Sequence, residues 1–267
     1  MNKSKRTFKL QDKINGVRGI WLAGLSFFNT YSYIIETSNG IFLIDTCGPG
    51  TGKIIKHALE SMNLAPSDIT GIALTHWHRD HTGSLAEIVS IAGTSSNPVK
   101  IFIHKEDAPF LLSQKKHWIK MNPEIILKVP HSPGKLPEKE KYQLIELNHL
   151  SGENPLKEWG FEFIHTPGHT PGHTSFLHKK SMSLFAGCGL SLFGKNTVGI
   201  VPIHDNRKKQ IESARKLATM DFTYLYPAHL SLRKDEIKKD QRIPFKGKIS
   251  LTDRLTGTLP IFRYPLK

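Results

Sequence analysis

Four side chains that can bind a transition metal fall within six consecutive positions of this chain. The run THWHRDHTG at residues 75–83 holds them: His76, His78, Asp80 and His81. Imidazole and carboxylate ligands suit zinc, with iron and manganese as competitors. One isolated histidine is more often an ordinary core or surface residue. Four ligand-capable residues at this spacing indicate a metal site instead.

The segment before this cluster predicts how its ligands converge. Residues 69–74 read ITGIAL, an apolar run typical of a buried strand. Residues two apart in extended backbone point to the same face, which lets His76 and His78 converge on one ion. Asp80 and His81 follow where the chain turns, and they can face a second ion. The cluster therefore begins where a strand opens into a loop.

Other ligand-capable side chains follow predicted strands elsewhere in the chain. A strand over 159–165 runs into the sequence TPGHTPGH, in which glycine and proline force a tight path around His169 and His173. Asp45 ends a predicted strand over 41–45. Either it steadies a metal ligand or it is an ordinary aspartate at a turn.

Two more candidates lie nearer the C-terminus. Cys188 stands in Gly-Cys-Gly after a predicted strand over 183–186, and His229 follows Tyr-Pro-Ala after a strand over 222–225. The candidate ligands are therefore far apart in the sequence, and several of them directly follow predicted strands.

The elements that must position these residues alternate between strands and helices. An early meander is predicted over 17–22, 30–36 and 41–45. Apolar residues at helical spacing predict helices over 51–62, 84–92, 105–113 and 206–220, the last with Asp205 as its N-cap. Prolines interrupt the pattern between about 115 and 155, which predicts an irregular insertion. The natural architecture is two sheets sandwiched between outer helices in a single domain.

Composition narrows the class of protein. The 267 residues carry 37 Lys+Arg against 23 Asp+Glu, a net charge of +14 that favours either an anionic small-molecule substrate or simply a basic surface. No compact arginine-rich stripe with interleaved aromatic residues occurs, so the nucleic-acid signal is weak. Two cysteines and no export or membrane-spanning signal make the cytoplasm the expected compartment, without membrane association. Oligomeric state is not encoded in any motif here.

These motifs and their order resemble the metallo-β-lactamase superfamily from about residue 19 to residue 229. The resemblance implies an α/β fold, a four-layer αββα sandwich, spanning residues 1–230 with the insertion at about 115–155. A basic C-terminal extension, 231–267, would pack on this domain or trail it. The resemblance also implies that one metal site is formed by His76, His78 and His169, and a second by Asp80, His81 and His229. Asp45 would be the carboxylate that steadies a ligand, and His173 would have a structural role unless it exchanges places with His169.

Cys188 is where the chain departs from the superfamily pattern. Most hydrolases of the superfamily carry an aspartate there, bridging two metals. A thiolate bound to the second zinc is one reading, since zinc takes sulfur readily. A small buried hydrophobe beside an empty second site is the other.

The chemistry that this resemblance implies is hydrolysis. One or two zinc ions, or iron or manganese, would generate hydroxide near neutral pH to cleave an ester, thioester, lactone or lactam. Asp80 would orient the nucleophile and carry a proton to the leaving group. The alternatives are an iron-dependent redox or sulfur-metabolising enzyme on the same scaffold, and a metal-dependent phosphodiesterase or nuclease.

Overall fold

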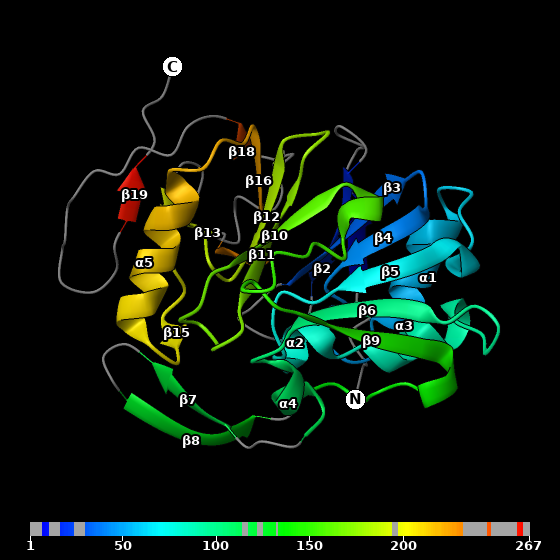
Figure 1. Ribbon diagram of the computed structural model, residues 1–267, viewed down its shortest axis with the longest axis horizontal. Coiled ribbons are helices and arrows are strands. Elements are labelled where there is room, and N and C mark those ends of the chain that lie inside the picture. The colour runs from blue at the N-terminus through cyan, green and yellow to red at the C-terminus, as the bar shows by residue number, and fades with distance from the viewer. Residues whose placement is uncertain are drawn as a thin grey trace.

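Two mixed β-sheets packed face to face form the centre of the computed structural model (Figure 1). The structure describes residues 7–10, 17–23, 30–113, 117–121, 125–131, 133–193, 197–231, 245–246 and 261–263. The first sheet contains, in spatial order, β1 (Thr7–Leu10), β2 (Val17–Ala23), β3 (Tyr31–Thr37), β4 (Gly40–Ile44), β5 (Ile69–Ala73), β6 (Val99–His104) and β9 (Tyr142–Leu147). The second contains β10 (Phe161–His165), β11 (Thr174–His178), β12 (Ser183–Gly187), β16 (Tyr224–Pro227) and β18 (Phe245–Lys246).

Helices cover the outer faces of these sheets, which confirms the predicted αββα sandwich (Figure 1). The helices α1 (Gly52–Glu60) and α3 (Leu85–Ala92) pack on the first sheet through one buried cluster that includes Ile55 and Ile88. On the far side, α5 (Arg207–Ala218) packs on the second sheet. Two short helices, α2 (Arg79–Thr82) and α4 (Ala108–Leu111), lie near one end of the first sheet.

Alternation along the strands builds the two buried layers. In β4, Phe42 belongs to the core between the sheets, whereas Leu43 belongs to the cluster beneath the helices. Between the sheets, the Phe42 ring lies 4.9 Å from that of Phe161, and the Tyr33 ring lies 5.3 Å from that of Phe185. A strand buried on both faces explains why the sequence shows an unbroken apolar run there.

The segment predicted to be irregular, about 115–155, contains the strands β7 (His117–Met121), β8 (Ile125–His131) and β9. Tyr142–Leu147 pairs in parallel with β6 as β9, at the edge of the first sheet. The sequence reasoning was wrong here because an edge strand is half exposed and this one stands among prolines. Farther from the sheets, β7 and β8 form a hairpin whose first strand pairs with β15 (Ile203–His204).

The observed helices are shorter than predicted, and one N-cap differs. The helix expected over 105–113 is the shorter α4. Asn206, not Asp205, caps α5: its side chain accepts a hydrogen bond from the backbone amide of Lys209 at 3.0 Å. Asp205 stands one position too early to reach the free amides of the first turn.

Three short strands of the C-terminal part pair with elements of the domain. β18 pairs with β16, while β17 (Leu230–Ser231) and β19 (Ile261–Arg263) flank the pair β13 (Ser191–Phe193) and β14 (Thr197–Gly199). Most of the predicted extension lies outside the described residues. In the part of the chain that is described, no helix has the length and apolar character needed to cross a bilayer.

Candidate metal centre

The carboxyl ends of strands from both sheets meet at one edge of the sandwich. β4, β5, β6 and β9 run parallel in the first sheet, and β12 runs parallel to β16 in the second. Loops that follow the carboxyl ends of parallel strands are the usual place for a site in such sheets. The residues predicted as ligands all follow these ends: His76, His78, Asp80 and His81 after β5, His169 after β10, Cys188 after β12 and His229 after β16.

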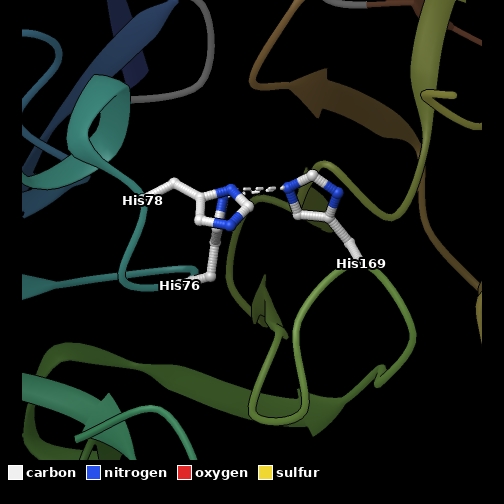
Figure 2. A group of neighbouring side chains, drawn as sticks. All are labelled: His76, His78 and His169. Carbon is white, nitrogen blue, oxygen red and sulfur yellow. Dashed lines mark hydrogen bonds between the residues drawn. The ribbon is translucent and has the colours of Figure 1, made fainter. Parts of the chain in front are cut away.

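Three imidazoles converge in the first of two groups (Figure 2). His169 Nε2 lies 3.1 Å from His76 Nε2 and 3.1 Å from His78 Nδ1. Their rings meet at 76–86°, so the edges rather than the faces approach one another. Two nitrogens that share a tetrahedral zinc ion lie about 3.3 Å apart, because each Zn–N bond is about 2.0–2.1 Å. The spacing of this group therefore suits one ion.

Hydrogen-bond partners assign the tautomers of two of these histidines. The Thr75 hydroxyl donates to the Asp45 carboxylate at 2.8 Å, so it accepts from Nδ1 of His76 at 3.1 Å. His169 Nδ1 donates to the carbonyl oxygen of Ile203 at 2.8 Å. When both imidazoles are neutral, each carries its single N–H on Nδ1, and the two Nε2 atoms face each other with their lone pairs. Such an arrangement fits a cation held between them.

The second group adjoins the first. Cys188 Sγ lies 3.6 Å from His81 Nε2, and His81 Nε2 lies 3.3 Å from His229 Nε2. Asp80 Oδ2 is 3.5 Å from both of these histidine nitrogens. The ring of His76 lies 3.9 Å from that of His81 and so links the two groups. All seven residues predicted as ligands come together, and Cys188 is turned toward the others.

Asp45 is buried beneath the ligands. It accepts hydrogen bonds from the Thr75 amide at 2.8 Å and from Nδ1 of His81 at 2.8 Å. Its backbone has a φ of 58°, an uncommon conformation for a residue with a side chain. A carboxylate that fixes the orientation of a histidine is a typical partner of a metal ligand. The contact directs His81 Nε2 toward Cys188 and His229 in the second group.

Hydrogen bonds within the protein engage both ring nitrogens of His173. Its Nε2 accepts a hydrogen bond from the Cys188 amide at 3.0 Å, and its Nδ1 bonds the Thr166 hydroxyl at 2.8 Å. His169, rather than His173, directs a ring nitrogen at His76 and His78. Gly187 packs against this ring with a φ of +56°, and an added Cβ would lie only 2.7 Å from His173 Nε2.

Charges in the centre favour a cation. Burial opposes the Cys188 thiolate, but His169 and two further histidines hold the pKa of this thiol well below its usual value. Burial also disfavours a charged His81, yet Asp80 and Asp45 raise the pKa of His81 well above its usual value. Despite burial, His81 in turn holds the pKa of Asp80 well below its usual value. A thiol and two carboxyl groups beside these histidines offer anionic ligands to a bound cation.

A second cluster of histidines, which the sequence reasoning missed, lies beside β6 and β10. It contains His104, His149 and His165, and a signal was available because His104 and His165 each end a strand. The His165 ring lies 4.1 Å from each of the other two, at interplanar angles of only 4° and 31°. Imidazole lone pairs lie in the ring plane, so near-parallel rings cannot aim them at one ion. His104 Nε2 and His149 Nδ1 bond each other at 2.9 Å instead.

This stack predicts acid sensitivity. Burial, with His165 and His149 nearby, lowers the pKa of His104 to about 3, against an unfolded value of about 6.5. The unfolded chain therefore binds more protons between these values, and stability falls as the pH drops below about 6.5. We expect His104→Phe, which keeps a stacked ring, to make the free energy of unfolding depend less steeply on pH. The decrease in slope should correspond to at most one bound proton.

Denaturant unfolding of the chelated protein at several pH values between 4 and 7 measures this slope. The exposed His57 provides the matched control, since His57→Phe should leave the slope unchanged. An equal slope in wild type and His104→Phe would contradict the prediction.

Comparisons with known proteins agree with this geometry. The sequence profile described as the Metallo-beta-lactamase superfamily matches residues 25–229. A probable metallo-hydrolase, YqjP of Bacillus subtilis (strain 168), is 29% identical over 219 residues, which cover 74% of this chain and 66% of YqjP. An atrochrysone carboxyl ACP thioesterase of Aspergillus fumigatus is 24% identical over 247 residues, covering 86% of this chain and 44% of the thioesterase. The chain thus spans less than two thirds of the length of these relatives.

A solved structure is similar to this chain over most of its length. The crystal structure of TTHA1623 in a di-iron-bound form superposes with a TM-score of 0.51 at 26% identity, covering 78% of this chain and 90% of that one. With the family profile matched over most of its length and its strand ends converging on one ligand-rich edge, the chain belongs to the metallo-beta-lactamase superfamily, whose members are mostly metal-dependent hydrolases.

Proposed function

We propose that this protein is a hydrolase that uses one or two zinc ions to cleave an ester, thioester, lactone or lactam bond in a small molecule. The observation that supports the proposal is the convergence of His76 Nε2 and His169 Nε2, which lie 3.1 Å apart while the Nδ1 atom of each ring bonds elsewhere in the protein. Leaving two lone pairs opposed in a buried site costs free energy unless a cation joins them. The net charge of +14 is compatible with an anionic substrate, as it is with a basic surface that has no such role.

The donor set favours zinc. His76, His78 and His169 would hold the first ion, and Asp80, His81, Cys188 and His229 would surround the second. Imidazole and thiolate together are typical zinc ligands, and thiolate disfavours a redox pair of irons. Iron stays the second candidate because TTHA1623, at 26% identity, has been solved in a di-iron-bound form. An iron-dependent redox or sulfur-metabolising activity is therefore the alternative function.

The side chains around the ions supply the rest of the mechanism. A bound divalent ion lowers the pKa of water to about 7, which makes hydroxide available at neutral pH. Asp80 is 39% exposed in its side chain, so it connects the buried histidines to solvent. Its carboxylate could orient the nucleophile by accepting a hydrogen bond, take up that proton as the nucleophile attacks, and deliver the same proton to the leaving group. Asp45 keeps Nδ1 of His81 protonated and its Nε2 directed at the site.

Metal analysis and chelation test the proposal. We expect the purified protein to carry one or two zinc ions per chain and to hydrolyse at least one substrate class in a panel of thioesters, esters, lactones, lactams and phosphodiesters. Chelation should abolish that activity, and added zinc should restore it. Activity that survives complete metal removal would refute the mechanism, and iron with a redox activity would favour the alternative.

A further inference from the structure

Asp107 lies between the two loops that carry the first group of histidines, although it belongs to neither. It follows β6 and occupies the N-cap position of α4, where an aspartate commonly accepts a hydrogen bond from the helix amides. Here the side chain makes no such bond. The carboxylate is turned away from its own helix toward the loops that follow β5 and β10.

Three donors from these loops bond to the Asp107 carboxylate. The Thr170 hydroxyl donates to Oδ2 at 2.7 Å, and the Gly172 amide donates to Oδ1 at 2.7 Å. The backbone amide of Trp77 is the third donor. Trp77 stands between His76 and His78, and Thr170 directly follows His169. One carboxylate is therefore hydrogen-bonded to both of the loops that carry the three ligands.

A carboxylate fits this position, and the amide of an asparagine would not. Asp107 is fully buried, which raises its pKa to about 7 in spite of the three hydrogen bonds. Burying a charge is costly, and it is offset only when strong hydrogen bonds are made. An asparagine would offer one oxygen and direct an N–H₂ group at the remaining donors. Only a carboxylate accepts all three bonds.

Gly172 makes the close approach possible. A Cβ at this position would lie 2.7 Å from the Asp107 nitrogen and 2.8 Å from Oδ1. Any side chain there would push the carboxylate and the loop apart. The glycine and the aspartate thus form a matched pair.

We infer that Asp107 is a positioning residue, which sets the distance between His169 and the pair His76 and His78 and so tunes the affinity of the first metal site. This inference rests on the proposed metal-dependent function. Residues that orient metal ligands typically change metal affinity by about 10–100-fold when they are replaced. Asp107 acts on the backbone that carries the ligands, whereas Asp45 bonds a ligand ring directly.

Cobalt titration tests the inference without any substrate. Co²⁺ reports its ligand geometry through its visible spectrum, and competition with a chelator gives its dissociation constant. We expect Asp107→Asn to bind the first Co²⁺ about 10–100-fold more weakly, with an altered spectrum. Thr170→Val removes one of the three donors at nearly constant volume, so it should shift affinity in the same direction by less. If Asp107→Asn does not fold, Thr170→Val tests the inference in its place.

A stability-matched control separates positioning from general damage. Ile88→Ala creates a cavity beneath α3, in the cluster between the helices and the first sheet, and should destabilise the protein without changing Co²⁺ affinity or spectrum. Wild-type affinity and spectrum in both Asp107→Asn and Thr170→Val would overturn the inference and leave the hydrolase proposal intact. If the wild-type protein binds no divalent metal, the proposed function itself fails.

Discussion

His169→Ala is expected to lower kcat/KM on the order of 10³-fold or more and to leave the protein folded. His169 is the one member of the first histidine group that comes from the second sheet, and its Nε2 lies 3.1 Å from nitrogens of both partners. Without it, two imidazoles from one short loop must hold the ion alone. We therefore expect the loss of bound metal to accompany the loss of activity.

Metal content per chain, measured after dialysis, checks this prediction independently of the substrate. His57→Ala provides a matched control, because His57 is an exposed histidine on α1. This variant should keep wild-type metal content and activity. Full metal occupancy and unchanged kcat/KM in His169→Ala would show that the first histidine group is not the catalytic metal site.

Replacing Cys188 is expected to have the second large effect, about 10²-fold in kcat with weaker binding of a second ion. Its sulfur lies 3.6 Å from His81 Nε2, and neighbouring histidines favour its thiolate. Cys188→Ala removes this donor altogether. Cys188→Asp supplies the carboxylate that most hydrolases of the superfamily carry there, so it should recover a large part of the activity. Both variants should lose the sulfur-to-metal charge-transfer band of the cobalt protein.

Cys47 is the control for that experiment. It is also buried, and its thiol donates to the carbonyl oxygen of Thr30 at 3.5 Å. Burial raises the pKa of Cys47, so it stays a neutral thiol. Cys47→Ala should keep the charge-transfer band and most of the activity. A band that disappears with Cys47 and persists without Cys188 would refute thiolate ligation by Cys188.

The local histidine cluster could be recognised from sequence because its ligands are neighbours in the chain. Spacing alone placed His76 and His78 on one face, and the structure brings them to one point. The distant residues are different: nothing in residues 165–173 alone distinguishes His169 from His173. The resemblance to a family supplied that choice, and the hydrogen bonds of His173 explain it.

Other features could not be read from one sequence. Tyr142–Leu147 has the burial pattern of an edge strand, partly exposed along most of its length, so its apolar signal is weak. Asp107 looks like an ordinary helix cap, and its partner Thr170 is 63 residues away. The histidine stack depends on the parallel pairing of β6 with β9, which brings His104 near His149, and on the second sheet, where His165 ends β10. In each case the missing information is contact between distant segments.

The division of the ligands between the sheets also bears on how the molecule holds together. His76 and His78 come from the first half of the chain and His169 from the second, so neither half has a complete set for the first ion. A shared ion would therefore act as a cross-link between the two sheets, and its binding free energy would include that of their docking. Because such coupling is reciprocal, substitutions among the inter-sheet aromatic residues, such as Phe42 and Phe161, would change metal affinity without touching a ligand.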